Sequence, residues 1–287
     1  MTVIIPEFKI HEKTHPGTVS LKVNDLQKEV TFYIHNIGLQ LISETATSAV
    51  LGVDGRALVA LREIKNGQVS PRKTGLYHMA FLLPERKDLG NVLYHLLSVK
   101  APITGAADHG YSEAIYLNDP EGNGIEIYHD KPRENWDIRS DGEIVGVTLE
   151  MDADGVLAAA DRKTNQLPAG TVMGHVHLKV AELNQTEKFY TDVLGISLKN
   201  NFGGQAKFFA AGDYHHHIGA NVWQSKNGAA INETDLGLES LTLLIPDKQN
   251  FVDVKEHIQQ TQEFLAEDEQ SFTVKDPNGL VFIFKME

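Results

Sequence analysis

Short runs of alternating hydrophobic and polar residues recur along the chain, and many of them end at a turn sequence. Segment 115–128 (IYLNDPEGNGIEIY) is the clearest case. Pro120 fixes one backbone angle, and the Gly and Asn residues after it tolerate left-handed conformations. The pattern therefore predicts a strand, a tight turn and a second strand. This hairpin can bring Tyr116 and Glu126 to the same face.

The hydrophobic pattern repeats at long range. Segment 21–26 (LKVNDL), followed by Phe-Tyr and then Gly38, matches segment 178–183 (LKVAEL), followed by Phe-Tyr and then Gly195. The matched residues are 157 positions apart, and the Asp-Pro pairs that begin at Asp119 and Asp276 share this offset. Self-similarity over such a period indicates a duplication.

Each half of the duplication divides again. Segments 17–64, 75–130, 174–225 and 238–286 share one plan: a short strand, an amphipathic helix that ends near a Gly, and then alternating, turn-rich strands. The sequence therefore predicts an α+β fold of four βαβββ modules. We expect residues 1–130 to hold modules 1 and 2, residues 131–173 to form a linker, and residues 174–287 to hold modules 3 and 4.

Composition narrows the kind of protein. The 287 residues contain no Cys, which excludes disulfides, thiolate nucleophiles and Cys-based zinc sites, so a metal would bind to His and carboxylates. The net charge of −13 argues against a nucleic-acid partner. We find neither a signal peptide nor an apolar run long enough to span a bilayer, so we expect a cytoplasmic protein without a membrane partner. A homo-oligomer stays open.

With this plan and this hairpin, the chain resembles the vicinal oxygen chelate superfamily. That superfamily includes glyoxalase I, thiol-transferring fosfomycin-resistance proteins and type I extradiol dioxygenases, and the chain resembles catechol 2,3-dioxygenases most closely. The resemblance implies that the four modules form two half-barrel clefts. It also implies that metal ligands come from the first and last strands of a module.

The family pattern selects three metal ligands. In the family, the first-strand ligand stands five residues before the closing hydrophobic residue, and this rule points to His78 in module 2 and His175 in module 3. The last-strand position of module 2 is Glu126. The outer modules have Thr18 and Ser240 at the first-strand position, and neither is a plausible ligand. We therefore expect module 2 to pair with module 3, and module 1 with module 4.

Two His and one carboxylate form a facial triad, which suits non-haem Fe(II) and leaves three coordination positions for substrate and O₂. The position of module 3 that matches Glu126 is Gly219, or Asn221 if the alignment slips by two residues. Three protein ligands favour a dioxygenase over glyoxalase I, which uses four. Mn, Zn and Ni are the alternative metals.

The resemblance also implies three catalytic residues. Tyr116 stands ten residues before Glu126, at the catalytic tyrosine position of extradiol dioxygenases. His109, followed by Gly, resembles the family's His-Gly pair. His216 matches the acid–base His, whose ordinary pKa of about 6.5 suits proton transfer in both directions.

Two His assignments stay open at this stage. Alternate residues of a strand face opposite sides, so part of the run His215-His216-His217 must point away from a site. Which of the three faces the site is undecided. His177 shares a strand face with His175, and we predict a packed, hydrogen-bonded side chain for it. We expect Trp223 to help shape a ring pocket.

The resemblance implies an Fe(II)-dependent extradiol dioxygenase that cleaves catechol or a small substituted catechol with O₂. One alternative is a glyoxalase-like isomerase or thiol transferase that uses a divalent metal as a Lewis acid. Another is a small-molecule binding protein of the same superfamily without catalysis. The ring substituents stay open.

Overall fold

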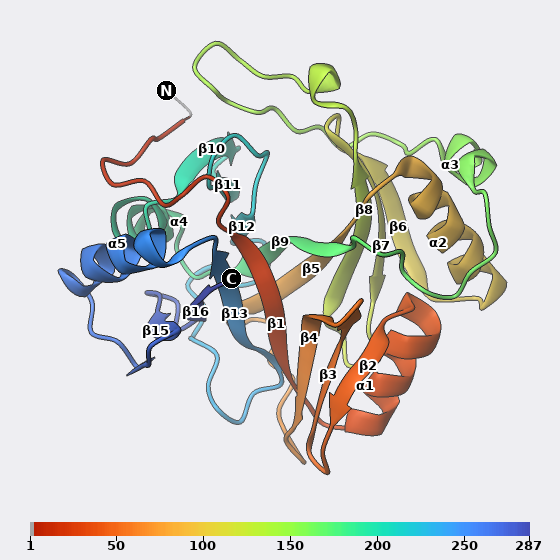
Figure 1. The fold of residues 1–287 in the computed structure, drawn as a ribbon, viewed down its shortest axis with the longest axis horizontal. Helices are drawn as coiled ribbons and strands as arrows, with labels where there is room; N and C mark the ends of the chain where they lie inside the picture. The colour runs from red at the N-terminus through yellow and green to blue at the C-terminus, as the bar shows by residue number, and fades with distance from the viewer. Residues whose placement is uncertain (1–2) are drawn as a thin grey trace.

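The strands of the protein form two large sheets, as the computed structural model of residues 3–287 shows (Figure 1). Both sheets have eight strands, in the orders β14-β15-β16-β13-β1-β4-β3-β2 and β10-β11-β12-β9-β5-β8-β7-β6. Both mix parallel and antiparallel neighbours, which agrees with the predicted α+β class. Between residues 3 and 287, no helix has the length and apolar character needed to cross a bilayer.

Each module supplies one half of a sheet. Module 1 consists of β1 (His15–Val23), α1 (Leu26–Phe32), the π-helical turn η1 (Tyr33–Ile37), β2 (Gln40–Glu44), β3 (Ser48–Val53) and β4 (Arg56–Glu63). Module 2 consists of β5 (Gly75–Leu83), α2 (Arg86–Ser98), β6 (Ile103–Asp108), β7 (Ser112–Asn118) and β8 (Gly124–Asp130). The connection to module 3 contains η2 (Arg133–Asn135) and α3 (Ala153–Ala159).

The second half repeats the plan. Module 3 consists of β9 (Val172–Lys179), α4 (Leu183–Lys188), the π-helical turn η3 (Phe189–Val193), β10 (Ser197–Phe202), β11 (Ala206–Ala210) and β12 (Ile218–Asn221). Module 4 consists of β13 (Gly237–Ile245), α5 (Lys248–Gln259), β14 (Ala266–Glu267), β15 (Ser271–Lys275) and β16 (Val281–Met286). The predicted four-module fold is therefore confirmed.

Local sequence explains where the module helices begin and end. The Asp25 side chain accepts a hydrogen bond from the Lys28 backbone N–H and begins α1. Gly38 closes the following π-helical turn with a φ of 91°, a conformation that favours Gly. In module 3, the Glu182 carboxylate caps α4, and Gly195 ends the helical stretch with a φ of 71°.

The two sheets each join strands from both halves of the chain. In one sheet β5 runs antiparallel to β9, and in the other β1 runs antiparallel to β13. Along β8, Ile125 and Ile127 are buried in the hydrophobic core. Glu126 lies between them and points to the opposite face, because successive strand residues alternate. The sheet therefore presents a polar row on the face opposite its core.

A repeated hydrogen bond ties one sheet to the other. Tyr33, just after α1, donates its hydroxyl proton to Asp119 in the turn between β7 and β8, at 3.0 Å. Tyr190, 157 residues later, donates to Asp276 at 3.1 Å. All four side chains are buried. The Asp-Pro turns thus fix the relative position of the sheets, in addition to reversing the chain.

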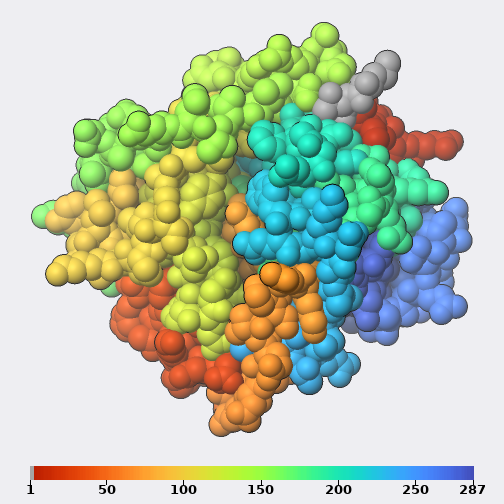
Figure 2. Space-filling model, turned by 180° about the vertical axis from the view of Figure 1, so that it is seen from behind, coloured from red at the N-terminus to blue at the C-terminus, as the bar shows by residue number. Residues whose placement is uncertain are grey.

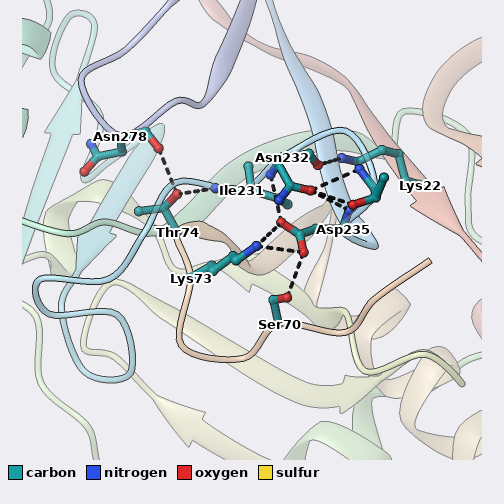
Figure 3. Close-up of polar contacts among 9 residues, drawn as sticks. Lys22, Ser70, Lys73, Thr74, Ile231, Asn232, Asp235 and Asn278 are labelled. Atoms are coloured by element: carbon teal, nitrogen blue, oxygen red, sulfur yellow. Dashed lines mark hydrogen bonds and ion pairs between the residues drawn. The ribbon is translucent and has the colours of Figure 1, made fainter.

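The loops 64–74 and 225–237, which link modules within each half, lie side by side (Figure 3). Asp235 accepts hydrogen bonds from Ser70 (2.8 Å), from Lys73 (2.7 Å) and from the Asn232 backbone N–H (2.8 Å). Lys22 of β1 donates to the Asn232 carbonyl at 2.6 Å. These contacts join the two loops to each other and to β1.

Candidate metal centre and adjoining cavity

Strand register brings the predicted metal ligands together. Tyr116, Glu126, Ala80 and His175 lie opposite one another on the neighbouring strands β7, β8, β5 and β9. His78 precedes Ala80 by two residues and therefore points to the same side. Ala80 is fully buried, and its small side chain leaves space among its larger neighbours.

The three predicted ligands form a compact cluster. Nε2 of His78 lies 3.1 Å from Oε2 of Glu126, and Nε2 of His175 lies 3.2 Å from the same oxygen. One ligand atom from each residue lies within 4.8 Å of the others, and all three residues are buried. In the described part of the chain, this is the cluster with the geometry to hold a metal ion.

The protonation states of the cluster suit a metal. Burial opposes ionisation of Glu126, but the nearby His175, which is hydrogen-bonded to it, and His78 outweigh burial and hold the Glu126 pKa well below its usual value. Burial lowers the pKa of His175 to about 4, so its imidazole is neutral at pH 7. Divalent ions require an ionised carboxylate and neutral imidazoles.

An unpaired nitrogen in the cluster is also consistent with a bound ion. Nε2 of His78 is buried and has no hydrogen-bond partner among residues 3–287, since its approach to Glu126 lacks hydrogen-bond geometry. Leaving a buried polar atom unpaired costs free energy, which a ligand at that position would recover. His78, Glu126 and His175 would therefore hold a divalent ion with two nitrogens and one oxygen.

The position that corresponds to Glu126 in module 3 carries no side chain. Glu126 lies opposite Ala80 across β8 and β5, and Gly219 lies opposite His177 across β12 and β9. A Cβ on Gly219 would stand 2.9 Å from the His177 ring, so the ring occupies the space that a fourth ligand would need. The candidate site thus offers three protein groups that could ligate a metal, with Gly219 rather than Asn221 at the position that matches Glu126.

His177 differs from its predicted role. We expected a packed and hydrogen-bonded side chain, but Nε2 of His177 is buried without a hydrogen-bond partner in the described residues. The His177 ring lines the cavity. It packs against Tyr77, Phe208 and Trp223, with ring centroids 5.2–5.5 Å apart. Burial, followed by the charges of His78 and His175, lowers its pKa well below 6.5. The packed part of the prediction is therefore confirmed, and the hydrogen-bonded part is wrong for Nε2.

The cluster opens into a cavity of about 630 Å³. This size is typical of sites for small molecules, which run from about 300 to 1,000 Å³. Figure 2 shows a hollow between the β6–β7 region in yellow and the segment near residue 220 in cyan. Trp223 is among the lining residues, as expected, and so are Tyr111 and Val147.

Tyr116 and His109 form a hydrogen-bonded pair at the cavity wall. Nδ1 of His109 lies 2.7 Å from the Val147 carbonyl, and a carbonyl only accepts, so Nδ1 carries the proton. Nε2 of neutral His109 therefore accepts from the Tyr116 hydroxyl, at 2.5 Å. The oxygen lone pairs of Tyr116 are then free to face a substrate.

The three consecutive His residues do not alternate as in a strand. His215 and His216 both line the cavity, while His217 stacks on Tyr214 and its Nδ1 accepts from the Ala211 backbone N–H. The expected alternation fails because residues 211–217 form turns and bends, and β12 begins only at Ile218. His216 lies 4.3 Å from His175, measured between ring centroids. Burial lowers the pKa of His216 well below 6.5.

Several known proteins have sequences similar to this chain. A family model described as Glyoxalase/Bleomycin resistance protein/Dioxygenase superfamily matches residues 15–127. A protein of Bacillus subtilis (strain 168) named Catechol-2,3-dioxygenase is 41% identical over 279 residues, which cover 96% of this chain and 98% of the relative. Biphenyl-2,3-diol 1,2-dioxygenase 3 of Rhodococcus globerulus is 25% identical over 178 residues, covering 60% of this chain and 94% of the relative.

Solved structures with the same fold have much lower sequence identity. Glyoxalase I from Zea mays superposes with a TM-score of 0.60 at 15% identity, over 96% of this chain and 92% of that one. A putative dioxygenase from Bacillus subtilis superposes with a TM-score of 0.64 at 13% identity, over 97% and 86%. The Bacillus relative that aligns along nearly the full length of both chains shows, together with the family match, that this chain belongs to the Glyoxalase/Bleomycin resistance protein/Dioxygenase superfamily.

Proposed function

We propose that this protein is an Fe(II)-dependent extradiol dioxygenase, which cleaves the ring of catechol or a small substituted catechol with O₂. The observation that carries the proposal is the three-ligand site, in which Gly219 stands where a fourth ligand would be. Two His and one carboxylate with open positions are typical of non-haem iron oxygenases. The 41% identity to a protein named Catechol-2,3-dioxygenase supports the same choice.

Iron held by His78, Glu126 and His175 would supply open coordination positions for the diol and O₂ and would favour the ionised diol. The cavity beside it binds the ring and excludes bulk water. His216 lies next to His175 and is neutral at pH 7, so its imidazole can accept a proton from a diol hydroxyl. The hydroxyl oxygen of Tyr116, held by His109, faces the same space and orients a substrate oxygen.

Anaerobic purification, removal of metal with a chelator and reloading with Fe(II) test the proposal. Catechol and O₂ are then added, and the yellow ring-opened semialdehyde and O₂ uptake are measured. Fe(II)-loaded protein is expected to consume one O₂ per catechol. Parallel loading with Mn(II), Zn(II) and Ni(II) identifies the active metal. His175→Ala should lose both metal and turnover, while His35→Ala, at an exposed position of η1, should keep both.

Full conversion of a glyoxalase-type substrate by the Ni(II) or Zn(II) form, with no O₂ uptake by the Fe(II) form, would refute the proposal and favour a Lewis-acid isomerase. A His175→Ala variant that binds catechols as tightly as the original chain would favour a binding protein. Neither result depends on the roles proposed for His216 and Tyr116.

A further inference from the structure

We infer that Asp130 and His215 are positioning residues that set which ring nitrogen of His216 carries its proton. This inference rests on the proposed function, because it assigns the means by which His216 becomes a base toward the cavity. Asp130 ends β8, four residues after Glu126, and the two His residues lie before β12. Asp130 thus comes from module 2, and both His residues come from module 3.

The three groups form a continuous chain of hydrogen bonds. Oδ1 of Asp130 lies 3.0 Å from Nε2 of His215, and Nδ1 of His215 lies 2.8 Å from Nδ1 of His216. Tyr214 donates its hydroxyl proton to the other carboxylate oxygen, Oδ2, at 2.8 Å. The Tyr214 oxygen in turn accepts from Tyr128, also at 2.8 Å. Both oxygens of Asp130 are therefore engaged as acceptors.

The direction of each bond follows from what each atom can do. A carboxylate only accepts, so Nε2 of His215 must carry the proton. A neutral imidazole has one N–H, which leaves Nδ1 of His215 as an acceptor. The proton between the two rings therefore belongs to Nδ1 of His216. Nε2 of His216 is then the ring nitrogen that keeps its lone pair.

Packing holds the chain in this geometry. His215 is 2% exposed and stacks on Tyr111, with ring centroids 4.2 Å apart and planes 11° from parallel. Trp136 covers it from another side at 5.3 Å. His216 packs against Phe208 at 4.9 Å and His175 at 4.3 Å. A flip of either ring would break the hydrogen bond between the two rings, so this packing and the hydrogen bonds together hold the order.

The order matters because a His acts as a base only through the nitrogen that lacks a proton. In this arrangement that nitrogen is Nε2 of His216, a residue that lines the cavity. The same logic orients the His of an Asp-His-Ser triad, with His215 here inserted between the carboxylate and the working ring.

The Asp130→Asn variant tests this order. Its amide N–H would donate to Nε2 of His215, which would move the His215 proton to Nδ1 and the His216 proton to Nε2. Long-range ¹H–¹⁵N spectra of protein loaded with Zn(II), a diamagnetic ion, report the protonated nitrogen of each ring. A His216→Gln variant assigns the signals. In the original chain we expect protonation of His216 at Nδ1, and in Asp130→Asn at Nε2.

Kinetics of the Fe(II) enzyme give a second readout. Asp130→Asn should lower kcat by about 100-fold or more, the usual contribution of a general base, with little change in KM. Asp137→Asn removes an exposed carboxylate on the connection after β8 and should change neither the spectra nor kcat. A loss of kcat in Asp130→Asn without any change in tautomer would reduce Asp130 to a structural role and overturn the inference.

A measurement on the original chain alone can also overturn the inference, so the test does not require the variant to fold. Protonation of His216 at Nε2 in the unmodified Zn(II) protein would contradict the assigned order. If the spectra show the expected order but the Fe(II) enzyme cleaves no catechol, the proposed function fails and the assigned order stands. If catechol is cleaved and Asp130→Asn keeps full kcat, the proposed function stands and the inference fails.

Discussion

Replacing Glu29 with Gln is expected to stabilise the protein at neutral and alkaline pH. Glu29 lies in α1 with an exposed fraction of 0%, and neither carboxyl oxygen has a hydrogen-bond partner in the described chain. Burial, followed by the charges of Asp119 and Glu121, raises its pKa from 4.5 to about 9. The second half of the duplication has Thr186 at the matching position, where it accepts a hydrogen bond from Asn278 at 2.9 Å. Thr186 is therefore hydrogen-bonded at the position where Glu29 has no partner.

The sign of the effect follows from linkage. A group whose pKa is raised by folding contributes stability that is fully present below its unfolded pKa, near pH 4.5, and is lost as the pH rises through about 9. Each pH unit within that interval changes the free energy of unfolding by about 1.4 kcal/mol. At pH 7 the loss reaches about 3 kcal/mol, and sharing of the proton with nearby Asp119 makes this an upper value. Gln cannot ionise and avoids this loss.

Urea unfolding of the metal-free protein at pH 5, 6, 7 and 8 measures the effect. Tryptophan fluorescence and circular dichroism should give the same transition if unfolding is two-state. We expect the free energies of Glu29→Gln and the original chain to be similar at pH 5 and to separate progressively toward pH 8. Glu256→Gln, which changes an exposed residue of α5, should not show this divergence. Parallel curves for Glu29→Gln and the original chain would show that the carboxyl is ionised in the fold and refute the reasoning.

Three further predictions concern the site and the fold. Glu126→Gln should weaken Zn(II) binding by more than about 100-fold in calorimetry, because even partners of metal ligands contribute 10–100-fold; unchanged affinity would remove Glu126 from the site. Gly219→Ala places a methyl group 2.9 Å from the His177 ring, so KM should rise while metal content by mass spectrometry stays constant; an unaltered KM would mean that the ring moves freely. Tyr190→Phe removes one donor to buried Asp276 and should lower the free energy of unfolding by about 1–2 kcal/mol, measured by urea titration; no change would show that the bond between sheets contributes nothing.

The sequence predicted the fold because the signals involved are local or periodic. Alternation of hydrophobic residues marked the strands, Gly38 and Gly195 marked helix ends, and the 157-residue offset revealed the duplication. Resemblance to known families then selected His78 and His175, which the strand register brings close to Glu126. The catalytic and metal-binding roles, and the division at residues 131–173, stay predictions.

Features that depend on register or on irregular backbone were beyond sequence reasoning. His215 was not distinguished from its neighbours because the pattern implied a strand where the chain makes turns. The contact of Asp130 with His215 joins residues 85 positions apart in different modules, and no local pattern encodes it. The unpaired Nε2 of His177 was missed because the place of its ring over Gly219 follows from the β9–β12 pairing rather than from either strand sequence alone.

The chain segment that forms one sheet lies between the two segments that form the other. The sheet that carries Glu126 is assembled from residues 75–221, whereas the other sheet needs β1 and β13 from opposite ends of the chain. A ribosome would therefore release all strands of the sheet that carries Glu126 before β13 emerges to pair with the open edge of β1. Until then the edge of β1, which contains Val19, Leu21 and Val23, can pair wrongly with another nascent chain. Dependence on chaperones during translation should accordingly follow the delay before β13 appears, rather than the assembly of the sheet that carries Glu126.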